Sequence, residues 1–131
     1  MAKLKITIVT PETTTLDQEA DFVVLPMFDG ESGVSANHAP MIGRLGPGEL
    51  RVKDGGTTDC FYVDGGFVQI ENNVVSVLTG ASTPSAEVDL AEAKQALADA
   101  EELPSNNSVE MEAKQKSVSQ AKAKLKIAER Q

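Results

Sequence analysis

The sequence predicts an α+β fold, in which an N-terminal antiparallel β-sandwich over residues 1–84 precedes a C-terminal two-helix antiparallel hairpin over residues 85–131. Two observations lead to this prediction. Short alternating or apolar runs separated by glycine-rich turns fill the first part of the chain, and many short strands with close turns are typical of a sandwich or barrel. After residue 84 glycine disappears, and alanine, glutamate and lysine take over, as in helices.

Strands are expected wherever apolar residues alternate with polar ones or form short uninterrupted runs, which are residues 4–8, 22–27, 60–63, 67–70 and 74–78. Asp54-Gly55-Gly56, Asp64-Gly65-Gly66 and Asn72-Asn73 supply residues that tolerate positive φ. Each of these three sequences is therefore expected to close a tight antiparallel hairpin.

Residues 31–50 contain two prolines, four glycines and the only histidine, His38. Ala39-Pro40 and Gly46-Pro47-Gly48 are expected to form two corners, because proline fixes φ and glycine lets the chain reverse. Residues 41–45 between them are expected to form a short edge strand. A pinned loop followed by an edge strand suits recognition of a partner.

Two helices are expected, at about 89–102 and 108–130, separated by Pro104-Ser105-Asn106. Asp89 and Asn107 each precede a glutamate by three positions, which is a helix-capping arrangement. The expected apolar stripes comprise Leu90, Ala93, Leu97 and Ala100 in the first helix and Met111, Val118, Ala121, Leu125 and Ala128 in the second. Because alanine buries little area, we expect a marginally stable hairpin that can exchange its contacts for those of a partner.

The composition narrows the function classes. The net charge of −8 argues against nucleic-acid binding, which requires surplus Lys and Arg. Neither a secretory signal nor an apolar run long enough to span a membrane is present, so we expect a soluble, cytoplasmic protein without direct membrane insertion. The single cysteine, Cys60, rules out an internal disulfide and a cysteine-based zinc cluster, and is expected to be a small buried side chain in a strand.

The charge is unevenly distributed along the chain. Residues 1–107 carry 6 basic and 17 acidic side chains, a net charge of −11, whereas residues 108–131 carry 6 basic and 3 acidic ones, a net charge of +3. Such polarity indicates a tail that docks on its own body or binds an acidic surface elsewhere, or else an ordinary solvated helix face.

An enzyme is one alternative, with His38 as a base and Asp29 or Glu31 as its partner. The sequence lacks the accompanying parts, because a zinc site, a Gly-x-Ser-x-Gly elbow and a phosphate-binding loop are all missing. We therefore expect neither a catalytic residue nor a metal site. For His38, partner contact and a hydrogen bond that stabilises its loop remain alternatives to catalysis.

Several motifs along the chain resemble one known family. Residues 33–34 and 37–42 read GV and NHAPMI, residues 45–51 read LGPGELR, and residues 61–68 read FYVDGGFV. Together with residues 74–78 and 88–93, they resemble the epsilon subunit of rotary F-type ATP synthases over essentially the whole chain. The resemblance implies a sandwich that binds the gamma subunit and the c subunits of the membrane rotor ring, and a hairpin that either folds against the sandwich or extends toward the alpha and beta subunits and inhibits ATP hydrolysis.

The resemblance also implies site residues, and a peripheral location on the cytoplasmic side of the bacterial inner membrane. By position, Glu31 matches the rotor-ring side and Thr10, His38 and Gly43 match the gamma side, with Met41 among the residues expected to contact these partners. Residues expected to meet the acidic catalytic head in the extended state are Lys114, Lys122 and Lys126.

Some bacterial members bind regulatory ATP through a motif of Ile or Leu, Asp, two variable residues, Arg and Ala. Here the corresponding residues 88–93 read VDLAEA, so Asp89 and Ala93 match while Glu92 replaces the arginine, and Lys124 stands where such members carry a further arginine. Like charge between Glu92 and a polyphosphate disfavours tight ATP binding. We therefore expect no required cofactor, and we expect Asp89 to act as a helix cap.

Two other functions remain open from the residues alone. A β-sandwich adaptor with a coiled-coil tail would share every compositional feature and lack only the His-Ala-Pro and Pro-Gly pattern. A small hydrolase that uses His38 is the enzymatic alternative. The variant His38→Ala distinguishes the two, because it would abolish the catalytic rate of a hydrolase but would only weaken the docking of a partner-binding protein.

Overall fold

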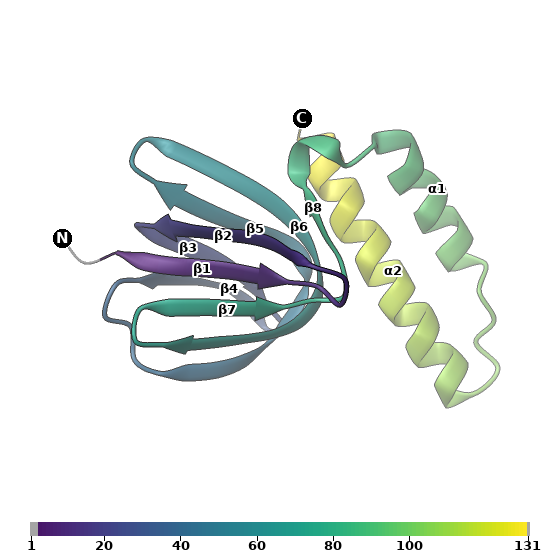
Figure 1. Cartoon of the computed structure of the whole chain (residues 1–131). Helices are drawn as coiled ribbons and strands as arrows, with labels where there is room; N and C mark the ends of the chain where they lie inside the picture. The colour runs from purple at the N-terminus through teal and green to yellow at the C-terminus, as the bar shows by residue number, and fades with distance from the viewer. Residues whose placement is uncertain (1–2, 131) are drawn as a thin grey trace.

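The computed structural model describes residues 3–130 and confirms a β-sandwich followed by two helices (Figure 1). The strands within these residues are β1 (Leu4–Val9), β2 (Thr14–Ala20), β3 (Phe22–Met27), β4 (Gly30–Ser35), β5 (Met41–Asp54), β6 (Thr57–Glu71), β7 (Val74–Leu78) and β8 (Ser82–Pro84). The 3-10 helix η1 (Ser85–Glu87) leads into α1 (Leu90–Glu101) and α2 (Ser108–Glu129).

The sandwich is one sheet that folds over on itself. Its strand order is β2-β1-β7-β6-β5-β3-β4, with β8 added to β6. The two long strands, β5 and β6, pair along almost their whole length, but their neighbours differ at the two ends. The last residues of β6 pair with β7, whereas its residues 61–63 pair with β8, and residues 51–53 of β5 pair with β3. The long strands therefore pass from one layer into the other.

The prediction of a hairpin at Asp64-Gly65-Gly66 is wrong, and so is the reversal expected at Gly46-Pro47-Gly48. Both sequences lie opposite each other inside β5 and β6, where the strands change layer, so residues 41–45 begin a 14-residue strand instead of forming a short one. Gly66 has φ +114°, and a Cβ there would overlap the carbonyl oxygen of Leu78. Glycine is needed at this bend because neighbouring backbone lies too close for a side chain.

The other two turns follow the prediction. Asp54-Gly55-Gly56 joins β5 to β6, and Gly55 has φ +62°. Asn72 and Asn73, with φ of +51° and +63°, join β6 to β7 as expected for a two-residue hairpin.

The core lies between the two layers and is aliphatic. Its buried members are Leu4, Ile6, Ile8, Ala20, Val23, Leu25, Val34, Leu45, Leu50, Val52, Val63, Val68, Ile70, Val75 and Val77. All of them belong to strands of the sandwich, so the sandwich has a complete hydrophobic core without the helices.

Both helices begin at the predicted caps. The carboxylate of Asp89 accepts a hydrogen bond from the backbone N–H of Glu92, and the side chain of Asn107 accepts one from that of Glu110, each at 2.9 Å. α2 lies between α1 and the sandwich in Figure 1, and its C-terminal end meets the sandwich near β5, β6 and η1.

The predicted stripes are only partly buried. The alanines Ala93, Ala100, Ala121 and Ala128 are buried, whereas Leu90 and Met111 are exposed. Ile127, outside the predicted stripe, is the one large side chain of the described helical residues that is fully buried. It is buried because the last turns of α2 also face the sandwich, a second contact surface that a helix-pair pattern does not include.

Candidate functional site

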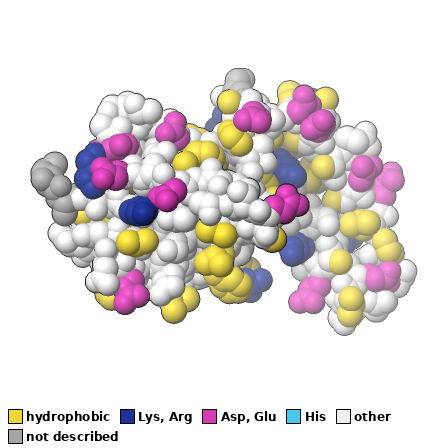
Figure 2. Space-filling view, viewed as in Figure 1, with side chains coloured by type: hydrophobic (Ala, Val, Ile, Leu, Met, Phe, Trp, Pro, Cys, Tyr) yellow, Lys and Arg dark blue, Asp and Glu magenta, His cyan; other side chains and the backbone are white. Residues whose placement is uncertain are grey.

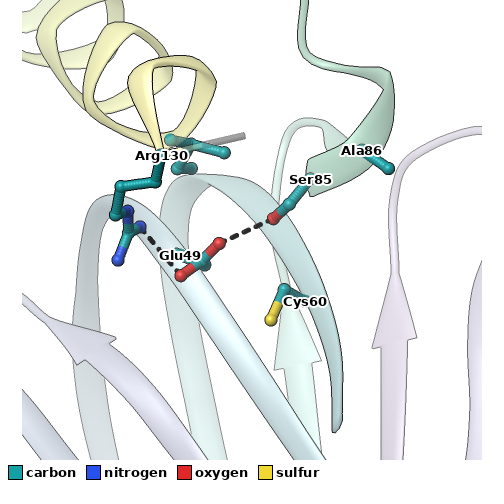
Figure 3. A pocket seen from close by; sticks show the side chains of 6 residues that line it. Glu49, Cys60, Ser85, Ala86 and Arg130 are labelled. Carbon is teal, nitrogen blue, oxygen red and sulfur yellow. Dashed lines mark hydrogen bonds and ion pairs between the residues drawn. The ribbon is translucent and has the colours of Figure 1, made fainter.

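The end of α2 is joined to the sandwich by a cluster centred on Glu49, whose side chain is only 12% exposed (Figure 3). Arg130, which caps the C-terminus of α2, donates from Nη2 to Glu49 Oε1 at 2.8 Å. Ser85 of η1 donates from Oγ to Glu49 Oε2 at 2.9 Å. Arg51, two residues along β5, lies 3.8 Å from Glu49 Oε1. We call Glu49, Arg51, Ser85 and Arg130 the Glu49 cluster.

Beside this cluster lies a small open hollow of about 340 Å³, lined by Glu49, Cys60, Ser85, Ala86, Ile127 and Arg130 (Figure 3). Cys60 is a partly buried β6 residue, so its thiol lies where hairpin and sandwich meet. Burial raises the pKa of this thiol, and the nearby charge of Glu49 raises it further.

A second contact between hairpin and sandwich is a cation–π interaction. The ammonium of Lys124 lies 5.1 Å from the centre of the Tyr62 ring, and the hydroxyl of Tyr62 donates to the carboxylate of Asp64. Burial raises the pKa of Tyr62, as does its hydrogen bond to Asp64. In Figure 2, Lys and Arg side chains of the hairpin lie toward the sandwich, and many Asp and Glu side chains lie on the side of the hairpin that faces away from the sandwich. The basic tail thus docks, in part, on its own acidic body.

Further from the sandwich, α2 carries an open groove of about 540 Å³. It is lined by Ser105, Met111, Lys114, Gln115, Val118, Ser119 and Lys122. Among residues 3–130, neither Lys114 nor Lys122 forms an ion pair, and the same holds for Lys126. These cations are therefore available to carboxylates of another molecule.

The outer face of the sandwich bears an apolar row. Arg44 of β5, Phe67 of β6 and Leu78 of β7 are directly paired, so their side chains lie on one face. Ile42 lies two residues from Arg44 on the same face and is 78% exposed, and the Phe28 ring lies 4.5 Å from the Arg44 guanidinium carbon. Figure 2 shows hydrophobic side chains gathered with a basic one on the part of the sandwich nearest the hairpin. A contiguous exposed patch of this kind marks an interaction surface.

Comparison with known proteins decides the family. A family model described as the beta-sandwich domain of the ATP synthase delta/epsilon chain matches residues 3–84. The ATP synthase epsilon chain of Rhodopirellula baltica is 47% identical over 94% of this chain and 96% of its own length. The chain belongs to the ATP synthase epsilon chain family. The resemblance inferred from the His-Ala-Pro and Pro-Gly motifs is thereby confirmed.

Other members of the epsilon chain family share the whole length of this chain. The sodium-ion-specific ATP synthase epsilon chain of Propionigenium modestum is 31% identical over 98% of this chain. The fold matches that of a chain in the OSCP/F1/c-ring structure of Euglena gracilis mitochondrial ATP synthase, with a TM-score of 0.82, 24% identity and coverage of 94% of this chain and 79% of that one. The sequence comparisons thus identify an ATP synthase epsilon chain, and the fold agrees with that of a chain in an ATP synthase assembly.

The structure spreads the expected partner-binding residues over the sandwich. Thr10 follows β1 and donates from Oγ1 to the carbonyl of Thr13 at 3.1 Å. His38 lies in the β4–β5 loop, where its Nδ1 is 2.7 Å from the carbonyl oxygen of Ala39. Met41 packs partly against the core. Thr10 and His38 lie at opposite ends of the sandwich. Thr10 follows Val9, which pairs with the last residue of β7, whereas the loop that contains His38 contacts the turn before the first residue of β7.

Glu31 and Gly43 occupy different surroundings. Glu31 is on β4 and its carboxylate is 3.1 Å from Arg51 Nη1, with 57% of its side chain exposed. The missing side chain of Gly43 would point inward and collide with Met27, so any contact at this position is made by backbone or by the outward neighbours Ile42 and Arg44. The roles of all five expected residues stay predictions.

The expected nucleotide-binding residues are not brought into one hollow. Asp89 caps α1, Ala93 is buried, and Lys124 contacts Tyr62, while Glu92 is exposed. Asp89, Ala93 and Lys124 line neither of the two hollows described above. The ATP site stays an expectation that Glu92 disfavours.

Within residues 3–130 we find no group of three or more His, Cys, Asp or Glu side chains placed to hold a metal ion. The imidazole of His38 bonds its own loop, and Glu31, one of its expected acidic partners, is engaged by Arg51. Among the described helices, none has both the length and the apolar character required to cross a membrane.

Sequence reasoning missed the apolar row and the Glu49 cluster. The apolar row was detectable in principle from the alternation of side chains along each strand. Its members Ile42, Phe67 and Leu78 are large apolar residues whose strand neighbours face the core, so they themselves must face outward. Glu49 and Arg130 were not detectable, because they are 81 residues apart and ordinary in type.

Proposed function

We propose that this epsilon subunit is a non-catalytic part of the central stalk, in which the sandwich docks on the gamma subunit and the rotor-ring c subunits while the helical hairpin inhibits ATP hydrolysis by the catalytic head. The site of action would be the cytoplasmic side of the bacterial inner membrane, where the protein is peripheral.

The single observation that supports this proposal most is the small contact between hairpin and sandwich. Among the described residues, its main interactions are buried Ile127, the Lys124–Tyr62 contact and the Glu49–Arg130 ion pair. A partner that offers equivalent contacts can replace these few interactions, which favours a two-state hairpin. Moving such an element from 1:99 to 99:1 requires a differential binding free energy of about 5.5 kcal/mol.

The two proposed functions, docking and inhibition, use different surfaces of the molecule. The apolar row with Ile42 and Phe67 suits docking to a protein surface, because it is exposed and contiguous across three strands. Lys114, Lys122 and Lys126 form no ion pair with another residue of 3–130, and they suit the acidic segments of alpha and beta subunits, since opposite charges steer association and fix register.

The proposal is tested by ATP hydrolysis with a purified head that contains gamma but lacks epsilon, taken from the same organism. The full chain and a chain ending at Ser85 are titrated into it, and binding is measured alongside activity. Binding by both with inhibition by the full chain alone supports the proposal. Binding by neither contradicts the docking part, and equal activity with both contradicts the inhibitory part.

A charge-matched pair of variants sharpens the inhibitory part. Lys114→Gln/Lys122→Gln should weaken inhibition on the order of threefold to tenfold, by loss of two contacts to carboxylates. Lys94→Gln/Lys116→Gln removes the same charge from the hairpin outside the groove and serves as the control. Equal weakening by both pairs would show that net charge alone is responsible.

A further inference from the structure

Four charged side chains connect the sandwich strand β4 to the end of α2 without a break. Glu31 Oε2 lies 3.1 Å from Arg51 Nη1, and the same nitrogen lies 3.8 Å from Glu49 Oε1. That oxygen accepts the 2.8 Å hydrogen bond from Arg130. Arg51 is thus shared by two carboxylates, and Glu49 is shared by two guanidinium groups.

We propose that this series of ion pairs couples Glu31 to the position of the hairpin: when a partner takes Glu31 from Arg51, Arg51 turns to Glu49, displaces Arg130 and releases the end of α2. The inference rests on the proposed function, in which the hairpin regulates, and on the expectation from the family resemblance that Glu31 lies on the rotor-ring side. The partner group that competes for Glu31 is a Lys or Arg side chain, because Glu31 offers an exposed carboxylate.

Competition at Glu49 follows from how its two oxygens are used. Oε2 accepts the hydrogen bond from Ser85 Oγ at 2.9 Å, so both cations approach Oε1. Two guanidinium groups at one oxygen repel each other, and Arg51 is at present held nearer to Glu31 than to Glu49. Loss of the Glu31 contact therefore strengthens the competitor of Arg130.

The Glu31–Arg51 and Glu49–Arg130 pairs differ in strength, and this difference favours an effect that passes from Glu31 to the hairpin. Glu31 is 57% exposed, so water screens both of its contacts with Arg51, from Nη1 to Oε2 at 3.1 Å and from Nη2 to Oε1 at 3.4 Å, and a competing cation can reach the carboxylate. Glu49 is 12% exposed, so its bond to Arg130 contributes more to holding the hairpin closed. A weak contact at the partner surface thus controls access to a stronger one at the hairpin.

Cys60 provides a built-in reporter of hairpin position. It is the only cysteine of the chain and lines the hollow together with Ile127 and Arg130, so departure of α2 uncovers its thiol. The measurement is the rate at which iodoacetamide, an uncharged reagent, alkylates Cys60 in the isolated full chain. No rotary complex is needed.

Arg130→Gln should increase the alkylation rate on the order of tenfold, since a charge-assisted hydrogen bond to a mostly buried carboxylate is lost. Arg130 itself lowers the pKa of Cys60, so its removal without hairpin movement would slow the reaction instead. A faster reaction therefore reports movement. Lys116→Gln, which removes the same charge from an exposed position of α2, should leave the rate unchanged.

Glu31→Gln is the decisive variant and should increase the rate about twofold to threefold, in line with the strength of an exposed pair. Because Arg51 is paired with Cys60 and itself lowers the pKa of the thiol, the same increase must also appear in the rate of tryptic cleavage within α2, which does not depend on Cys60. Glu31→Gln/Arg51→Gln should react no faster than Arg51→Gln, because the competitor of Arg130 is gone. If Glu31→Gln reacts like the unchanged chain, or if the double variant keeps the full increase of Glu31→Gln, the coupling is overturned. Far-UV circular dichroism checks that these mostly exposed changes leave the fold intact.

The outcomes separate this inference from the proposed function. Coupling in the alkylation assay without inhibition of ATP hydrolysis would overturn the inhibitory role and leave the ion-pair series standing. Inhibition without coupling would overturn the series alone. High salt offers an independent check: it should accelerate alkylation of the unchanged chain and have a smaller effect on Arg130→Gln, which lacks the screened bond.

Discussion

The sandwich and the hairpin bury different kinds of side chain. Fifteen buried residues, all but one of them Val, Leu or Ile, form the sandwich core. The described hairpin residues bury four alanines and a single large side chain, Ile127. A fully buried Val, Leu or Ile contributes about 1.5–3 kcal/mol, and alanine far less.

The difference teaches which part of the molecule is built to move. A region held by many large apolar contacts unfolds only as a whole, whereas a region held by one anchor and a few polar contacts opens at low cost. Sandwich variants should therefore change global stability, and hairpin variants should change the population of open molecules.

The largest effect is expected from Leu25→Ala in the sandwich core. Leu25 is completely buried, so its truncation removes transfer free energy and leaves a cavity. The free energy of unfolding should fall by about 2–5 kcal/mol. Urea denaturation followed by circular dichroism measures it. A loss below about 1 kcal/mol would mean that the core relaxes around the site and is less tightly packed than the burial indicates.

A smaller and qualitatively different effect is expected from Ile127→Ala. Loss of the anchor should raise the rate of tryptic cleavage within α2 by about tenfold, because cleavage follows the open population, while the unfolding of the sandwich stays nearly unchanged. Val109→Ala, an exposed change on the same helix, is the matched control. If Ile127→Ala lowered sandwich stability as much as Leu25→Ala does, the two regions would be one cooperative unit.

The strands β1, β3 and β7 and both caps were predictable because their signals are local, whereas β2 and β4 were not predicted, because only one residue of each is buried and neither shows an apolar pattern. Alternation locates β1 and β7, and the spacing of Asp89 and Asn107 to glutamate locates both helix starts. Glycine turns were less informative. Asp54-Gly55-Gly56 closes a hairpin and Asp64-Gly65-Gly66 bends a continuous strand, although the two sequences look alike, because only the path of neighbouring strands distinguishes them.

The candidate surfaces were harder to predict than the fold. The matching motifs indicated a docking role for residues 31–50, but Gly43 faces inward while its neighbour Ile42 faces out, which requires knowledge of the strand register. The Glu49 cluster draws on β5, η1 and the end of α2. No spacing in the sequence brings these segments together, since their proximity follows from how the hairpin docks.

The smallest expected effect is the pH dependence of hairpin docking through Cys60. Burial raises the pKa of its thiol in the docked state, with Glu49 and Asp59 acting in the same direction and Arg51 and Arg130 against it. A raised pKa means that docking is fully stabilised below the pKa of the free thiol and loses this contribution as the pH rises through the docked value. The alkylation rate of the full chain should therefore reach its half-maximum at a higher pH than that of Ile127→Ala, whose open population is larger. Coinciding pH profiles would show that Cys60 remains equally hydrated in both states, and that the hairpin covers less of the sandwich than its contacts indicate.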